Sequence, residues 1–181
     1  MLPLSGQVVE GTGEARFFQW TVGILRIMYG LLWLQQASWK VPPDFGREAG
    51  DGLWYWLNQA VQHPAWSVHH AFLTKVVLPN FILFGYLTLL TEAFIGFTMF
   101  LGLFARLGAL AGFLMSLNIT LSVLRVPNEW VWTYLMLIGY SLLFLSIRPG
   151  RSLGLDSLLA RWVGETVTRQ GTVTKLLSLI V

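Results

Sequence analysis

The sequence predicts an all-α polytopic membrane protein, a bundle of four transmembrane helices with a long outer loop that contains short interfacial helices. Of the 181 residues, 55% are hydrophobic and only 12% are charged, which is about half the charge of a typical soluble domain. Four apolar segments each reach the length of about 18 residues that predicts a transmembrane helix. The nine tryptophans and five tyrosines fit aromatic belts at the headgroup level. We therefore expect the lipid bilayer to surround the chain.

The membrane domain is predicted over residues 1–163, with a C-terminal tail over residues 164–181. The first span, about residues 17–37, contains Arg26 and is followed by an outer loop of about forty residues. Pro42 and Pro43 stop the helix there, because proline lacks a backbone donor and restricts the residue before it.

Within the outer loop, residues 52–63 have apolar side chains at helical spacing beside Trp54, Tyr55 and Trp56. This pattern predicts an interfacial helix that lies in the membrane plane. Pro64 ends it, and we expect residues 65–77 to be a second helical piece that leads into the next span.

The remaining spans are predicted at about residues 79–104, 107–124 and 130–147. The third is rich in glycine and alanine, and these small residues should face the inside of the bundle because they let helix backbones approach closely. A short surface helix is expected over residues 157–163, and the apolar run at 176–181 should lie against the membrane or a neighbouring subunit.

The distribution of basic residues indicates the orientation. With four spans, seven basic residues share the side of both termini, and four lie on the opposite side. The positive-inside rule then puts both termini in the cytoplasm.

Three predicted spans each carry a strongly polar residue: Arg26, Glu92 and Asn118. Counted from the predicted inner ends at about 1.5 Å per residue, their depths are about 14, 18 and 16 Å. We therefore expect Arg26 and Glu92 to form an ion pair, with the Asn118 amide hydrogen-bonded beside them. The cluster is either a buried clasp that fixes helix register, or part of a catalytic cavity that binds a quinone carbonyl or a small oxyanion, or relays protons. A clasp should be dry and fully paired, whereas a site should leave a donor or acceptor facing a pocket.

A second cluster, at the outer end of the first span, contains Gln35, Gln36, Trp39 and Lys40. It is a candidate for substrate binding or ligand gating, although snorkelling lysine and interfacial tryptophan give the same pattern. Arg106, in the short turn after the second span, is a further candidate for substrate binding.

Several classes of site are excluded by composition and position. The chain has no cysteine, which excludes disulfides, a thiol nucleophile and iron–sulfur clusters. The histidines all fall in the outer loop, so haem ligands are missing from the spans, and His69-His70 have no third ligand at useful spacing for a metal. We therefore expect no bound haem, flavin, iron–sulfur cluster or metal. The formal charge of only +3, spread along the chain, also excludes a nucleic-acid surface.

Three motifs occur in order on the four predicted spans. They are Leu25-Arg26-Ile27 with Gly30 and Trp39-Lys40; Glu92 with Ile95-Gly96 and the segment at 101–108, LGLFARLG; and the segment at 150–156, GRSLGLD. Together they resemble the DoxX family and its DoxD relatives, from about residue 21 to residue 156. The resemblance implies a multi-pass, four-helix protein of the prokaryotic cell (inner) membrane. It further implies a link to thiosulfate:quinone oxidoreductase, in which electrons from a sulfur compound reach the quinone pool.

Two main hypotheses follow for the activity. In the first, the chain is a membrane subunit of a quinone-linked redox system, with quinone as substrate and electrons supplied by a sulfur compound such as thiosulfate. In the second, it is a non-catalytic accessory subunit that stabilises a larger respiratory or photosynthetic membrane complex. Both imply other membrane subunits or self-association. A small carrier is a third alternative, which the absence of an evident inverted repeat disfavours.

Overall fold

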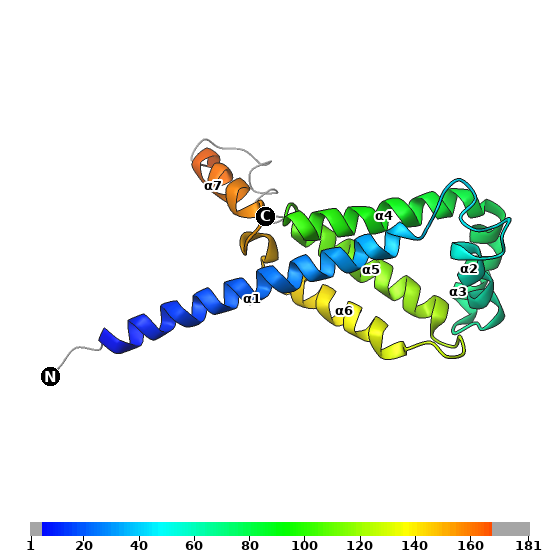
Figure 1. Cartoon of the computed structure of the whole chain (residues 1–181), viewed down its shortest axis with the longest axis horizontal. Coiled ribbons are helices and arrows are strands. Elements are labelled where there is room, and N and C mark those ends of the chain that lie inside the picture. Colours follow the sequence, from blue (N-terminus) through cyan, green and yellow to red (C-terminus); the bar gives the residue numbers. More distant parts are fainter. Residues whose placement is uncertain (1–4, 168–181) are drawn as a thin grey trace.

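The computed structural model describes residues 5–167, and every regular element in that part of the chain is helical. Four helices form the body of the molecule: α1 (Ser5–Ser38), α4 (Phe81–Leu101), α5 (Ala105–Val123) and α6 (Val131–Ser146). In sequence, α1 packs on α4, α4 on α5 and α5 on α6, and Figure 1 shows the resulting bundle.

Three helical stretches are long and apolar enough to cross a membrane by length and composition: Gly13–Ser38, Ser67–Leu101 and Ala105–Val123. The chain is therefore a membrane protein. The predicted fourth span coincides with α6, an apolar helix of 16 residues. Because α6 is shorter than the other three, a fourth crossing stays a prediction.

Two short helices, α2 (Gly52–Gln62) and α3 (Ser67–Phe72), lie across one end of the bundle (Figure 1). They pack on the start of α4 through a core of buried apolar side chains: Phe45, Leu57, Ala60, Leu73, Val77 and Phe81. The loop between α1 and α4 is therefore an ordered cap over one end of the bundle, which we call the outer end, and the opposite end is called the inner end.

The second long helix begins earlier than its predicted start at residue 79. After α3 the chain continues through a π-helical turn, Leu73–Val77, and a 3₁₀ turn, Leu78–Asn80, directly into α4. Pro79 stands in the first turn of the 3₁₀ segment, where a missing backbone donor does not interrupt a helix. The prediction that residues 65–77 feed helically into this span agrees with the structure.

Both ends of α1 differ in position from the other bundle helices. Its first half extends past them on one side, and its second end stops partway along α4 (Figure 1). The extension leaves Phe17, Phe18 and Trp20 between 57% and 75% exposed. The early stop leaves space beside the outer half of α4.

Small residues bring the bundle helices together. A Cβ atom added at Gly30 of α1 would collide with the backbone of Phe100 on α4, so these two backbones nearly touch. On α5, Gly108, Ala109 and Gly112 are buried, as the glycine and alanine pattern predicts. Close approach of this kind is the usual basis of helix packing in membranes.

After α6 the chain makes a short turn, Pro149–Arg151, and then forms α7 (Asp156–Val167). This helix covers the short helix predicted at 157–163. The apolar run at 176–181, expected at the membrane or a neighbouring subunit, lies outside the described residues.

Candidate functional site

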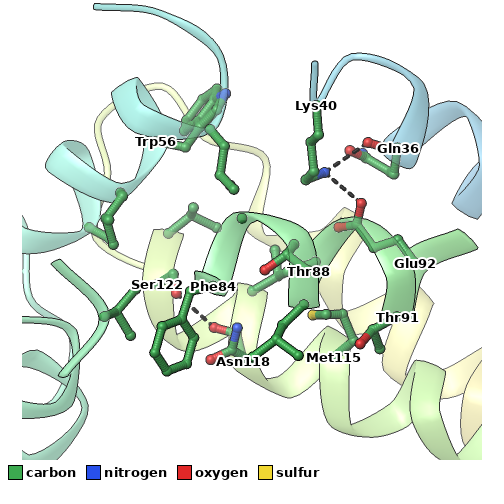
Figure 2. A pocket seen from close by; sticks show the side chains of 18 of the residues that line it. Gln36, Lys40, Trp56, Phe84, Thr88, Thr91, Glu92, Met115, Asn118 and Ser122 are labelled. Atoms are coloured by element: carbon green, nitrogen blue, oxygen red, sulfur yellow. Dashed lines mark hydrogen bonds and ion pairs between the residues drawn. The ribbon is translucent and has the colours of Figure 1, made fainter. Parts of the chain in front are cut away.

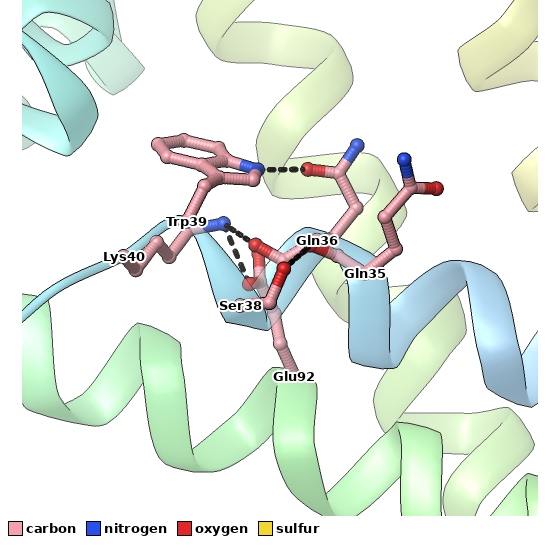
Figure 3. A network of polar contacts seen from close by, with 6 residues as sticks. All are labelled: Gln35, Gln36, Ser38, Trp39, Lys40 and Glu92. Carbon is pink, nitrogen blue, oxygen red and sulfur yellow. Dashed lines mark hydrogen bonds and ion pairs between the residues drawn. The ribbon is translucent and has the colours of Figure 1, made fainter.

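The buried carboxylate of Glu92 pairs with Lys40. The Lys40 Nζ lies 2.6 Å from Glu92 Oε2, and the two side chains are 3% and 1% exposed. Lys40 Nζ also donates a hydrogen bond of 2.8 Å to the carbonyl oxygen of Gln36 and lies 3.8 Å from the centre of the Trp39 ring. Figure 3 shows this group at the end of α1.

Local structure explains why a lysine beyond the helix reaches Glu92. α1 ends at Ser38, and the Lys40 backbone N–H bonds to the carbonyl of Ala37, so the chain turns tightly over the helix end. One turn of α4 beyond Glu92, Gly96 lets α1 approach so closely that an added Cβ would collide with Leu34. The end of α1 therefore lies at the level of Glu92.

The ion pair offsets a large desolvation penalty. An isolated buried charge costs several kcal/mol, and an opposite charge in contact compensates most of that cost. Burial lowers the pKa of the Lys40 ammonium, and the neighbouring Glu92 carboxylate opposes that shift.

The predicted ion pair between Arg26 and Glu92 is wrong. The Arg26 guanidinium instead donates hydrogen bonds to the carbonyl oxygens of Met99 and Phe100, the latter at 3.0 Å, and to that of Leu153 at 2.9 Å. These acceptors include unpaired carbonyls at the C-terminal end of α4, which carry the negative end of the helix dipole. Met99 is about 10 Å further along α4 than Glu92 at 1.5 Å per residue. The predicted depth of Arg26 was wrong because α1 extends well past the inner end of α4. The predicted start of the first span therefore does not mark the level at which the bundle begins.

The same inner end contains a second helix cap. The Asp156 carboxylate accepts hydrogen bonds from the backbone N–H groups of Phe104 and Ala105, at 2.7 and 3.0 Å, and so caps the N-terminus of α5. Gly102 adopts a left-handed conformation with φ 66°, and its Cα lies against Gly154. The motif at 150–156 therefore joins the start of α7 to the α4–α5 turn.

The predicted site residues thus separate into two groups. Arg26 lies at the inner end of the bundle, where it and Asp156 join the ends of α4 and α5 to the segment after α6; we call this group the inner clasp. Arg106 donates a hydrogen bond to the carbonyl of Leu145 at 3.0 Å. Neither these arginines nor Gln35, whose side chain is exposed, line the cavity described next. The residues that do line it together are Gln36, Trp39, Lys40, Glu92 and Asn118.

A cavity of about 690 Å³ lies beside the Lys40–Glu92 pair, between the end of α1, the cap formed by α2 and α3, and the outer halves of α4, α5 and α6 (Figure 2). It occupies the space that α1 leaves by stopping partway along α4. Its walls are mostly apolar. Leu87 of α4 and Leu114 of α5 line it and are 48% and 58% exposed, so part of its wall is formed by apolar side chains at the surface of the bundle.

Asn118 faces this cavity one helix away from Glu92. Its side-chain oxygen Oδ1 lies 3.3 Å from Nε2 of His69 on α3. The expected contact with the ion pair is therefore replaced by a contact with the cap.

Sequence reasoning missed several residues of the cavity wall, among them Trp33, Trp56, Thr88, Thr91 and Tyr134. Thr88 carried a signal, because it precedes Glu92 by four residues and so shares its helix face. The tryptophans and Tyr134 come from other helices, and only the folded arrangement brings them here.

The cavity has the make-up of a ligand site. Ligand pockets are typically about 300–1,000 Å³, with apolar walls and a few polar groups. Here the polar groups include an ammonium donor and a carboxylate that can accept a hydrogen bond or carry a proton. The two side chains of the pair are almost fully buried, as expected of a clasp, yet both of them also line the cavity.

Comparison with known proteins places the chain in a family. The family model for DoxD, described as the small subunit of TQO (thiosulfate:quinone oxidoreductase), matches residues 20–180. No curated protein and no solved structure gives a match. The matched region contains the inner clasp at Arg26 and Asp156, the Lys40–Glu92 pair and Asn118. The chain therefore belongs to the DoxD family of membrane proteins.

Proposed function

We propose that this chain is the membrane subunit of a quinone-linked oxidoreductase and that its cavity binds the quinone head group beside Lys40 and Glu92. The observation that carries the proposal is the cavity itself, in which a buried ion pair lies at the edge of a mostly apolar space of about 690 Å³. A quinone has carbonyl oxygens that accept hydrogen bonds, an apolar ring and an apolar tail, and the cavity offers a matching surface to each.

The exposed part of the cavity wall supports a lipid-soluble ligand. Leu87 and Leu114 are exposed on helices that are long and apolar enough to be surrounded by lipid. A ligand that enters there comes from the bilayer, and an isoprenoid tail could extend back past the same side chains. A water-soluble anion would gain little from such an entrance, and Glu92 already neutralises the Lys40 charge.

In this proposal Lys40 donates a hydrogen bond to one quinone oxygen, and Glu92 provides an acid group next to it. Reduction of a quinone to a quinol takes up two electrons and two protons. The electrons come from a sulfur compound such as thiosulfate, which is oxidised at a partner subunit. Glu92, a carboxylate in the ion pair, takes up one proton from water and passes it to the adjacent reduced oxygen, and the second proton reaches the other oxygen from water. With both termini in the cytoplasm, as the basic residues predict, the cavity lies in the outer half of the membrane.

Quinone binding can be measured through the tryptophans of the cavity. Quinones quench indole fluorescence, and Trp33, Trp39 and Trp56 line the site. Purified protein in detergent, titrated with decylubiquinone and with menadione, should show saturable quenching. Glu92→Gln should weaken binding at least tenfold, because it removes the anion that keeps Lys40 charged and in place to donate to the quinone. A hydrogen bond to a charged group contributes about 1.5–3 kcal/mol, and each 1.4 kcal/mol is a factor of ten.

The matched control is Glu48→Gln, the same change at an exposed position of the outer loop. It should leave the affinity unchanged. Equal affinities for the wild type, Glu92→Gln and Glu48→Gln would contradict the assignment of the head group to this cavity.

A second function is favoured by the free half of α1. Phe17, Phe18 and Trp20 stand on a helical extension that no other described element covers, as expected of an accessory subunit that docks on a larger membrane complex. Gentle extraction followed by native gel electrophoresis distinguishes the two. Constant association with one large complex, combined with no quinone binding, would support the accessory role.

A further inference from the structure

The cavity has a second polar group, at some distance from the ion pair. Asn118 and Ser122 of α5 lie on the opposite side of Thr88 from Lys40 and Glu92 (Figure 2). Between the two polar groups the wall includes Thr88 of α4 and the apolar side chain of Met115 of α5 (Figure 2). The cavity therefore offers charged or amide contacts at two places, with uncharged side chains between them.

The register of α4 and α5 sets the difference in height between these two places along the helix axis. Gly108 packs on Thr98, and Gly112 packs on Ile95. Because the two helices run antiparallel, the same register brings Asn118 level with Thr88, one turn before Glu92. The four residues from Thr88 to Glu92 correspond to about 6 Å along the helix axis, so Asn118 and the ion pair face the cavity at different heights.

His69 determines how the Asn118 amide is oriented. The side-chain oxygen of an asparagine can only accept, so the 3.3 Å contact is a hydrogen bond from Nε2–H of His69 to Oδ1 of Asn118. The amide nitrogen then carries both of its N–H groups. Among residues 13–161, whose side chains are described, no hydrogen-bond acceptor is paired with that nitrogen.

An amide donor left without an acceptor in a membrane helix is unfavourable, because lipid offers no compensating partner. Asn118 is exposed and lines the cavity, so a ligand that fills the cavity lies within its reach. We propose that Asn118, oriented by His69, donates a hydrogen bond to the second carbonyl oxygen of the bound quinone. The site then selects ligands with two carbonyl oxygens on opposite sides of one ring.

This inference rests on the proposed quinone site and deepens it. Lys40 binds one oxygen, Asn118 binds the other, and the uncharged wall between them contacts the ring. His69 touches no ligand atom in this arrangement and acts as a positioning residue. A ring with one carbonyl accepts a hydrogen bond from only one of the two donors, and so loses the contribution of the other.

The test compares two ligands of the same size. Menadione has two opposite carbonyl oxygens, and 2-methyl-1-tetralone has one. The affinity of the purified full-length protein for menadione is measured by tryptophan quenching, and its affinity for the tetralone by quenching or by competition with menadione. The wild type should bind menadione at least tenfold more tightly than the tetralone. Asn118→Leu should weaken menadione about tenfold and leave the tetralone unchanged, which removes the preference.

Three further variants keep the test independent of folding effects. Asn118→Ala removes the same amide with a smaller side chain and should reproduce the loss of preference. His69→Phe keeps an aromatic ring against Phe72 but removes the donor, and should lower the ratio of the two affinities by a smaller factor. Asn80→Leu, an amide change outside the cavity, should preserve the ratio.

The outcomes separate this inference from the function on which it rests. If menadione binds and Glu92→Gln weakens it, but Asn118→Leu leaves the ratio intact or weakens both ligands equally, the second hydrogen bond is refuted and the quinone site stands. If neither ligand binds the wild-type protein, both proposals are refuted.

Discussion

A double-mutant cycle on Lys40 and Glu92 tests whether the ion pair holds the outer half of the bundle together. The variants are Lys40→Met, which keeps the length of the side chain, Glu92→Gln, which keeps its shape, and the double variant. Each single change leaves the other member of the pair without its partner at a position that is 3% or 1% exposed.

The expected magnitudes follow from this burial. Breaking a buried pair by removing one partner costs about 3–5 kcal/mol, whereas replacing both members with neutral groups is often close to neutral. Each single variant should therefore lose about 3 kcal/mol of unfolding free energy or more. The double variant still buries an amide at position 92, so it should recover only part of the two losses. The expected coupling energy is about 2–3 kcal/mol, which is within the range for contacting residues.

Equilibrium unfolding in mixed micelles, followed by circular dichroism as the denaturing detergent increases, gives the four free energies. Glu48→Gln serves as the exposed control and should change stability by less than about 0.5 kcal/mol. Single losses below about 1 kcal/mol that add in the double variant would show that the two charges do not interact in the folded protein, and the site as described would be refuted.

Three further changes address the close contacts of the bundle, each measured in the same unfolding assay. Gly30→Leu should destabilise the protein by about 1–3 kcal/mol through overpacking against α4, whereas Gly139→Leu, at a position with open space around it, should have little effect. Arg26→Met should cost about 2 kcal/mol because it leaves buried carbonyls at the end of α4 unpaired, without lowering menadione affinity. Asp156→Ala should cost about 1–2 kcal/mol by removing the cap of α5, and an unchanged midpoint would contradict that role.

The helices and their order could be predicted from the sequence because apolar length and helix-stopping residues are local properties. The bounds of α2, α5 and α6 each fall within about two residues of the prediction. The start of α4, at Phe81, also falls two residues from the predicted start of its span, and the helical path that leads into it from Ser67 was expected as a separate helical piece. The length of α1 was underestimated, because its polar first residues do not prevent a helix outside the bilayer.

The candidate site was predicted only in part. Glu92 and Lys40 were both identified, but in separate clusters, since the relative height of two helices depends on packing that no single helix reveals. Gly30 and Gly96 fix how α1 slides along α4, and that register takes Arg26 to the inner end and Lys40 to the carboxylate. Had the glycines been used as height markers in place of helix ends, the partner of Glu92 could have been deduced.

The place where α1 ends has a consequence for how the outer half of the molecule is kept in shape. The interior of a helix bundle is normally filled with side chains. Beyond the end of α1, the cap formed by α2 and α3 instead covers an internal space. A molecule that fills this space packs where further turns of α1 would otherwise pack, and contacts both the cap and the long helices. The occupied protein should therefore resist heat and proteolysis of the 39–66 segment better than the empty one.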